Sequence, residues 1–214
     1  LDAGTGFGQY AFYVASEFPN ARVVAVDIKE DYLEDARTFI ERTPHRDRIE
    51  FEVHDLRELR IDRRFDLILS VDVMEHIAED RQVFRNFARV LKPGGHLVVN
   101  TPSDLGGSDV AHEGEEGFIE EHVRPGYNRE ELVEKLHEAG LEPIRARYTY
   151  GAYGSTAWRL LIKWPMKLIE RSSAAYAILP LYYMVALPVG TVLNALDVRS
   201  ENVRGTGLLV VARK

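Results

Sequence analysis

The chain has 214 residues, of which 45% are hydrophobic and 29% charged, as in a globular domain with a sizeable core and unlike a disordered segment. Its formal net charge of −7 argues against non-specific binding to nucleic acid. Cysteine is absent, which excludes disulfides, thiolate nucleophiles and cysteine-based zinc sites and is consistent with a cytoplasmic protein.

The chain opens on a glycine-rich turn. Gly4, Gly6 and Gly8 alternate with other residues between the end of a predicted strand and an apolar helical pattern over residues 8–18. A turn of this kind presents unpaired N–H groups to a ligand, but it is equally typical of an ordinary strand-to-helix connection. The spacing is G-x-G-x-G and not the G-x-G-x-x-G of dinucleotide-binding loops. Because strands usually have about five or six residues, we expect further chain before Leu1.

Strands and helices alternate along the rest of the chain, which predicts a mostly parallel sheet covered on both faces. The predicted strands span residues 22–27, 49–53, 65–71, 96–101, 141–150 and 207–213. One predicted helix spans residues 30–43, and a second follows the fourth strand and ends near residue 91. A third spans residues 129–139, with Asn128 as its N-cap. Residues 92–95 (KPGG) are predicted to form a turn. Residues 102–127 form a long connection, as in a lid or a binding loop.

Acidic residues follow several predicted strands. Asp27 comes about 20 residues after the glycine turn, where a carboxylate can bind ribose hydroxyls; the alternative is an N-cap for the next helix. Asp55 follows the third strand, and Ser70 to Asp72 end the fourth. Because ligands of such sheets bind beyond the carboxyl ends of the strands, these residues predict one site at that edge.

These motifs resemble the class I S-adenosylmethionine-dependent methyltransferases, over nearly everything except about residues 155–200. The resemblance rests on LDAGTGFG at residues 1–8, Asp27, HDL at 54–56, FDLI at 65–68 and LKPGG at 91–95. EHI at residues 75–77 and HVRPGY at 122–127 are similar to the branch that methylates small molecules. The family fold is an α/β, Rossmann-like sheet of seven strands with an antiparallel last strand, which implies that the last two predicted strands form a hairpin.

The resemblance also implies a cofactor site. Asp2 is expected near the amino group of S-adenosylmethionine, Asp27 at its ribose and Asp55 at its adenine. Ser70 and Asp72 would border the methionine and the sulfonium. The implied cofactor residues are Asp2, Gly4, Gly6, Gly8, Asp27, Ile28, Asp55, Leu56, Ser70 and Asp72. S-adenosylhomocysteine is the implied product.

Histidines are the candidate bases for a hydroxyl acceptor. His122 and His76 are the candidate catalytic residues, although the preferred interpretation of His76 is a structural role at the start of its helix. His112 has acidic neighbours and is expected to be solvated. The predicted substrate contacts are Tyr127, Arg124 and Trp158. No pair of histidines has metal-ligand helical spacing, so we predict no metal.

An apolar insertion is predicted over residues 155–200, between domain segments 1–154 and 201–214. It begins with interleaved tryptophan, lysine and arginine over about 12 residues and continues without any charge over residues 172–196. A single membrane crossing would separate strands that must pair, the first segment is too short for a return span, and Pro180 and Pro188 are predicted to break the run. The insertion is therefore a lid over an apolar cleft, an element lying in a membrane interface, or a packed helical pair.

The sequence predicts methyl transfer to a small, hydrophobic acceptor, lipid-like or quinone-like, at oxygen in preference to nitrogen or carbon. Two alternatives stay open: an NAD(P)-dependent oxidoreductase, and a non-catalytic, membrane-associated module that binds S-adenosylmethionine. Nucleic acid is not an expected partner. The expected location is the cytoplasm, and the insertion suggests that the protein also contacts a membrane there.

Overall fold

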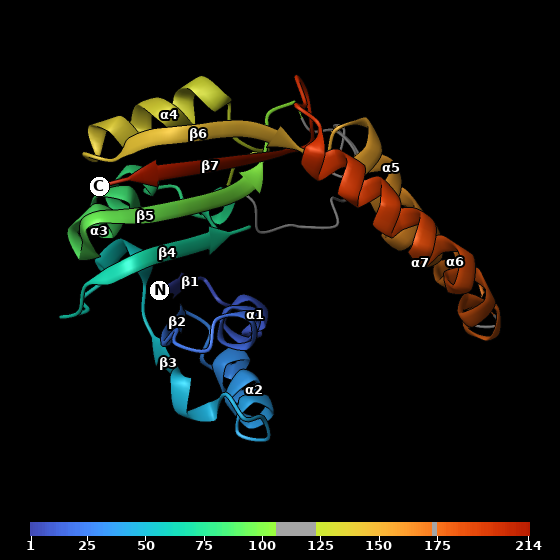
Figure 1. The fold of residues 1–214 in the computed structure, drawn as a ribbon, viewed down its shortest axis with the longest axis horizontal. Helices are drawn as coiled ribbons and strands as arrows, with labels where there is room; N and C mark the ends of the chain where they lie inside the picture. Colours follow the sequence, from blue (N-terminus) through green and yellow to red (C-terminus); the bar gives the residue numbers. More distant parts are fainter. Residues whose placement is uncertain (106–122, 173–174) are drawn as a thin grey trace.

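The computed structural model describes residues 1–105, 123–172 and 175–214. Its centre is a seven-stranded sheet in the order β3-β2-β1-β4-β5-β7-β6, in which β7 runs antiparallel to both neighbours (Figure 1). The strands are β1 (Asp2–Ala3), β2 (Val23–Asp27), β3 (Ile49–Val53), β4 (Phe65–Val71), β5 (Leu91–Pro102), β6 (Glu142–Thr149) and β7 (Gly207–Arg213). The predicted sheet and its antiparallel last strand are confirmed.

Helices cover both faces of the sheet because its strands are apolar on both sides. In β2, Val23 and Ala25 pack with α1 (Gln9–Glu17) and the end of α2 (Glu30–Ile40). The alternate residues of the same strand, Val24 and Val26, belong to the opposite core with helices α3 and α4. These helices span α3 (Asp80–Val90) and α4 (Arg129–Glu138). The alternation is the period-two pattern expected of a strand buried on both faces.

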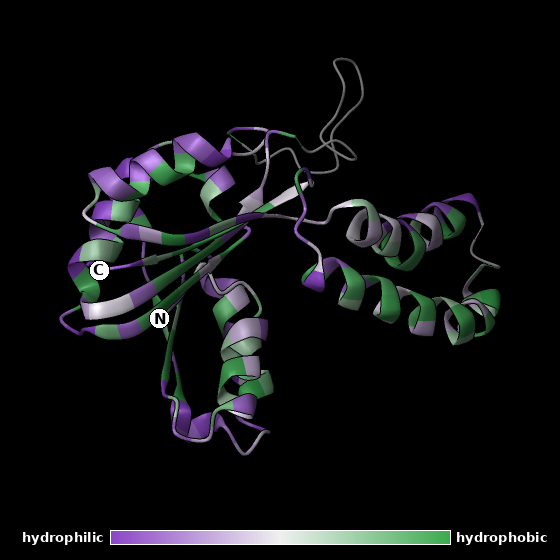
Figure 2. Cartoon of the chain, turned by 45° about the horizontal axis from the view of Figure 1, so that its top comes forward, coloured by the Kyte–Doolittle hydropathy of each residue, from purple (hydrophilic) through white to green (hydrophobic). Residues whose placement is uncertain are grey.

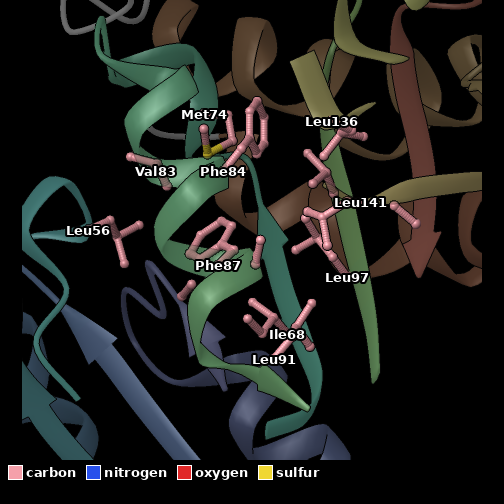
Figure 3. Close-up of a cluster of buried hydrophobic side chains, with 14 of the residues drawn as sticks. Leu56, Ile68, Met74, Val83, Phe84, Phe87, Leu91, Leu97, Leu136 and Leu141 are labelled. Carbon is pink, nitrogen blue, oxygen red and sulfur yellow. The ribbon is translucent and has the colours of Figure 1, made fainter. Parts of the chain in front are cut away.

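The larger core holds β4 and β5 against α3. Phe84 and Phe87 of α3 belong to one buried cluster with Ile68 of β4, Leu97 of β5 and Leu136 of α4 (Figure 3). All five side chains are fully buried, and each contributes about 1.5–3 kcal/mol by leaving water. This packing fixes the carboxyl ends of β4 and β5.

Residues 92–95 differ from the prediction of a turn before the fifth strand. β5 begins at Leu91, which pairs with Phe65, and pairing then resumes between Leu67 and His96. The intervening residues bulge out of the strand and are held by the end of the chain: the Gly94 N–H donates to the Lys214 carbonyl at 2.9 Å. This long-range partner lengthens the strand beyond what the local sequence indicates.

Between β6 and β7 the chain leaves the sheet as a helical hairpin over residues 152–199, where the sequence predicts an insertion over 155–200 (Figures 1 and 2). The first arm consists of α5 (Ala152–Trp158), a π-helical turn (Arg159–Lys163) and α6 (Trp164–Arg171), and the second arm is α7 (Ala175–Arg199). The first arm is thus longer than the predicted segment. Pro180 and Pro188 lie inside α7 at exposed positions, so the predicted break in the helix is wrong.

Asp197 fixes the base of the hairpin. Its carboxylate accepts hydrogen bonds from the N–H groups of Tyr150 and Gly154, both at 3.0 Å. Because β6 and β5 both run antiparallel to β7, β6 is parallel to β5, and its carboxyl end lies at the same edge of the sheet. The hairpin therefore projects from the edge at which ligands of such sheets bind.

Candidate functional site

The glycine turn after β1 is packed tightly against the loop after β4. The N–H groups of Gly4 and Thr5 both donate to the Val26 carbonyl, at 2.8 and 2.9 Å. Gly4 has a φ of +78°, and a Cβ there would lie 2.3 Å from a methyl of Val73. Only glycine fits this position, both for its backbone conformation and for its space.

Asp27 connects the glycine turn to the end of β2. Its Oδ2 accepts from the N–H of Gly6 at 2.8 Å, and its Oδ1 accepts from the N–H of Lys29 at 3.0 Å. The N-cap position of α2 belongs to Lys29, so Asp27 does not cap that helix. Its carboxylate instead stands at the wall of a pocket beside the turn.

This glycine-loop pocket has a volume of about 690 Å³ and lies at the carboxyl edge of the sheet. Its walls include the predicted residues Gly4, Gly6, Asp27, Ile28, Asp55, Leu56, Asp72 and His76. Residues from the ends of β1 to β4 are thus brought together, as expected from the parallel strand order. The pocket is large enough for a nucleoside-sized ligand.

Several residues of the pocket wall were not predicted from the sequence, among them Arg57, Tyr32 and Lys29. Arg57 binds both oxygens of Asp55, with Nη2 2.7 Å from Oδ2, and these hydrogen bonds hold the pKa of Asp55 below its ordinary value. Tyr32 contacts the Phe7 ring at 4.6 Å between centroids, and the Lys29 ammonium lies 5.0 Å from the Tyr32 ring. The position of Tyr32 in the first turn of the helix after Asp27 is the signal that could have found it.

Asp2, Ser70 and Gly8 lie behind the pocket, not in its wall. Asp2 is 2% exposed, and its Oδ2 accepts from the Thr5 hydroxyl at 2.5 Å and from the Ala11 N–H at 3.1 Å. Burial raises the pKa of Asp2. The Ser70 hydroxyl is buried without a hydrogen-bond partner, and Gly8 is the N-cap of α1. Their structural contribution is to shape the turn and the end of β4.

Asp72 joins the glycine-loop pocket to a second cavity. It has a φ of +54°, unusual outside glycine, and burial raises the pKa of its carboxyl. The second cavity, of about 200 Å³, is lined by Asp72, Asn100, Tyr150, Ser155 and the predicted Trp158, among others, and we call it the Trp158 pocket. The site thus consists of a larger and a smaller space that share one carboxylate.

Glu75 is buried beside this junction. It is 1% exposed, and one of its oxygens accepts from the Thr101 hydroxyl at 3.1 Å. Burial raises the pKa of Glu75 to about 7, and the negative charge of Asp72 contributes in the same direction. His76, a predicted base, lines the glycine-loop pocket. His112 and His122 fall outside the described residues.

Replacing Glu75 by glutamine is expected to stabilise the fold by on the order of 2 kcal/mol near pH 8 and to change little near pH 4. The carboxyl has a pKa of about 7 in the folded protein and near 4.5 when unfolded, so stability falls as the pH rises between these values. Urea denaturation across this range measures the effect, with the exposed Glu17→Gln as the control. A pH-independent difference would show that ionisation of Glu75 is not its cause.

Arg124 and Tyr127, two of the predicted substrate contacts, both meet Asp80. Tyr127 has no exposed surface, and its hydroxyl donates to Asp80 at 2.7 Å and to the Met74 carbonyl at 3.2 Å. Arg124 pairs with Asp80 as well, and its Nη2 donates to the Ile77 carbonyl at 2.7 Å. Both residues therefore hold the segment before α4 against the start of α3, and neither is among the residues that line the glycine-loop pocket or the Trp158 pocket.

Across residues 1–105, 123–172 and 175–214, no group of three or more histidine, aspartate or glutamate side chains is placed to hold a metal ion. The absence of a metal from the protein remains a prediction from sequence.

The first part of the chain matches a known protein family. Residues 1–95 match a family model described as a methyltransferase domain. The chain is 31% identical over 168 residues to 27-O-demethylrifamycin SV methyltransferase of Amycolatopsis mediterranei, an alignment that covers 74% of this chain and 61% of that relative. The chain therefore spans about three fifths of the length of this curated relative.

Two solved structures resemble the whole chain. The [4+2]-cyclase SpnF has a TM-score of 0.67 at 20% identity, and this chain covers 73% of it. A putative sarcosine dimethylglycine methyltransferase from Galdieria sulphuraria has a TM-score of 0.66 at 20% identity, with 76% of that chain covered. At this identity the two likenesses show a common fold and nothing about the reaction.

Proposed function

Because the chain belongs to the class I S-adenosylmethionine-dependent methyltransferases, we propose that it transfers a methyl group from S-adenosylmethionine to a small, hydrophobic acceptor. The observation that carries the proposal is the pair of adjoining spaces at the carboxyl edge of the sheet. The glycine-loop pocket would hold the donor and the Trp158 pocket would hold the acceptor, with Asp72 between them.

The residues of the glycine-loop pocket fit the donor. Asp27 presents a carboxylate already oriented by two N–H groups, which suits the hydroxyls of a ribose, and Ile28 follows it in the wall. Asp55, fixed by Arg57, offers an acceptor for an amino group, with Leu56 beside it. Gly4 leaves space at a point where a Cβ would collide with Val73. When bound, S-adenosylmethionine supplies an electrophilic methyl group on a sulfonium.

Residues of the Trp158 pocket would position the acceptor, and a histidine would accept its proton. Trp158 and Tyr150 provide aromatic surface in the acceptor pocket, which favours a lipid-like or quinone-like molecule. Oxygen is the favoured atom, and the curated relative is named for an oxygen acceptor, whereas the Galdieria protein is named for an amine. His76 or His122 would take the proton of a hydroxyl acceptor. We place the reaction in the cytoplasm, at a membrane surface.

Two titrations test the proposal against its competitors. S-adenosylhomocysteine is expected to bind, and a nicotinamide dinucleotide is not. Incubation of the protein with S-adenosylmethionine carrying a deuterated methyl group and a lipid and quinone extract should then yield labelled products by mass spectrometry. Binding of the dinucleotide alone would favour an oxidoreductase, and nucleoside binding without any labelled product would favour a non-catalytic module.

Asp27→Ala is expected to weaken binding of S-adenosylhomocysteine by about 1–3 kcal/mol, because the ribose loses its carboxylate partner. Isothermal titration calorimetry measures the loss. The matched control is Asp31→Ala, which removes an exposed acid from the first turn of α2 and should leave affinity within about 0.5 kcal/mol. If the melting temperature falls while the affinity is unchanged, Asp27 stabilises the fold through Gly6 and Lys29 and does not bind the ribose.

A further inference from the structure

The two arms of the hairpin are held together by specific contacts. The hydroxyls of Tyr182 and Tyr183 donate to the carbonyls of Leu160 and Leu161 in the π-helical turn, at 2.5 and 2.8 Å. Gly190 packs so closely that a Cβ there would lie 2.6 Å from Leu161. The hairpin is thus a defined element with an inner face and an outer face.

The outer face of α7 is apolar and uncovered. Its exposed large side chains include Leu181 and Val185, both 69% exposed, and Met184, 73% exposed. Within the described parts of the chain, α7 is the one helix long and apolar enough to cross a membrane, and only 11% of its most apolar window is buried. A core helix of a soluble domain would be buried, so this surface indicates an apolar partner. Figure 2 shows the two arms projecting away from the sheet domain.

The hairpin has the opposite charge to the rest of the chain. It contains five basic and two acidic residues, although the whole chain has a net charge of −7. Four of the basic residues, Arg159, Lys163, Lys167 and Arg171, recur at intervals of four along the first arm. Residues at this spacing are neighbours on a helix, so the first arm carries a basic stripe. Basic stripes beside apolar surface are typical of helices that lie on anionic membranes.

We propose that the hairpin docks onto an anionic lipid bilayer, with its arms lying in the interface rather than crossing it. The basic stripe extends from Arg159 to Arg171, and a membrane crossing would place some of these charges in hydrocarbon, which is strongly unfavourable. Both ends of the hairpin also return to one point, because Thr149 pairs with Gly207. Lying flat, the apolar side chains enter the acyl region and the basic groups reach the headgroups.

This docking deepens the proposed function and, for the acceptor, rests on it. Ser155 and Trp158 belong to the first arm and also line the Trp158 pocket. A docked hairpin would therefore place that pocket at the membrane surface, where an amphiphilic acceptor can enter from the bilayer. Binding to vesicles itself requires no methyl transfer, so the two proposals can be tested separately.

Flotation of the full chain with vesicles tests the docking. We expect flotation with phosphatidylcholine mixed with phosphatidylglycerol, decreasing as salt is raised, and little with phosphatidylcholine alone. Replacing Arg159, Lys167 and Arg171 together by glutamine should weaken binding to the anionic vesicles about 100-fold at low salt. Equal flotation of this variant, or flotation independent of lipid charge, would overturn the proposal.

A second variant tests the apolar face. Replacing Leu181, Met184 and Val185 together by glutamine should reduce flotation at least about tenfold, since all three side chains are exposed and would enter the bilayer. In the matched control, Ile144 and Val203, which are exposed apolar residues of the sheet domain, are replaced by glutamine. This control should float like the unmodified protein. If the first variant instead dissociates a dimer by light scattering while flotation is unchanged, a second copy covers the face and the proposal is wrong.

Two measurements keep these results interpretable. Circular dichroism and S-adenosylhomocysteine affinity, measured on every sample, report folding and the state of the glycine-loop pocket independently of lipid.

A fluorescence experiment tests docking of the first arm. Trp158→Phe leaves Trp164, 54% exposed on α6, as the remaining tryptophan. Its fluorescence should shift to the blue on anionic vesicles and be quenched by brominated lipid; an unchanged spectrum would contradict docking of this arm.

Discussion

Asp80→Ala is expected to destabilise the fold by about 3–5 kcal/mol, the typical cost of removing one partner from a buried ion pair. Asp80 is 3% exposed and meets Arg124, Lys135 and the Tyr127 hydroxyl, with its Oδ2 2.7 Å from the Lys135 ammonium. Without the carboxylate, two cations and a hydroxyl lose their common acceptor in a low-dielectric environment. Urea denaturation near pH 7 measures the loss.

An exposed pair of the same chemistry provides the control. Asp66 and Lys92 also lie 2.8 Å apart, but the Asp66 side chain is 84% exposed, so Asp66→Ala should destabilise the fold far less than Asp80→Ala. Burial raises the pKa of Asp80, but the hydrogen bonds from Lys135 and Tyr127 and the charge of Arg124 outweigh it and lower the pKa overall. The contribution of Asp80 is therefore present above about pH 4 and lost in stronger acid. Similar losses for both variants would contradict the buried network.

Much of the site could be predicted because parallel strands place their carboxyl ends at one edge. Asp27 and Asp55 follow separate strands in the sequence, and both line the glycine-loop pocket. Local sequence could not distinguish pocket wall from support. Asp2 belongs to the same glycine motif, yet its carboxylate is used by Thr5 and Ala11, a consequence of how the turn folds over the start of α1.

Local sequence also does not reveal contacts between residues that are far apart in the chain. Tyr127 and Arg124 were expected to face the substrate because they lie in a long connection, but both meet Asp80, more than 40 residues earlier. The two prolines of α7 are exposed, and the helix continues through both of them up to Arg199.

Gly4→Ala is the variant that most directly tests the glycine-loop pocket. It is expected to cost about 2–4 kcal/mol of stability and to weaken S-adenosylhomocysteine binding at least about tenfold. A left-handed conformation costs a residue with a Cβ about 1–2 kcal/mol, and the collision with Val73 adds overpacking strain against a stiff β-branched side chain. Denaturation and calorimetry measure the two effects.

Two further variants separate the conformational cost of Gly4→Ala from the collision. Gly140 has the same φ of +78° with nothing within 4 Å of a built Cβ, so Gly140→Ala should cost only about 1–2 kcal/mol and leave affinity unchanged. Combining Gly4→Ala with Val73→Ala removes the methyls at 2.3 and 2.8 Å and should restore part of the stability and affinity. If the double variant is no better than Gly4→Ala, backbone conformation alone makes glycine necessary at this wall of the pocket.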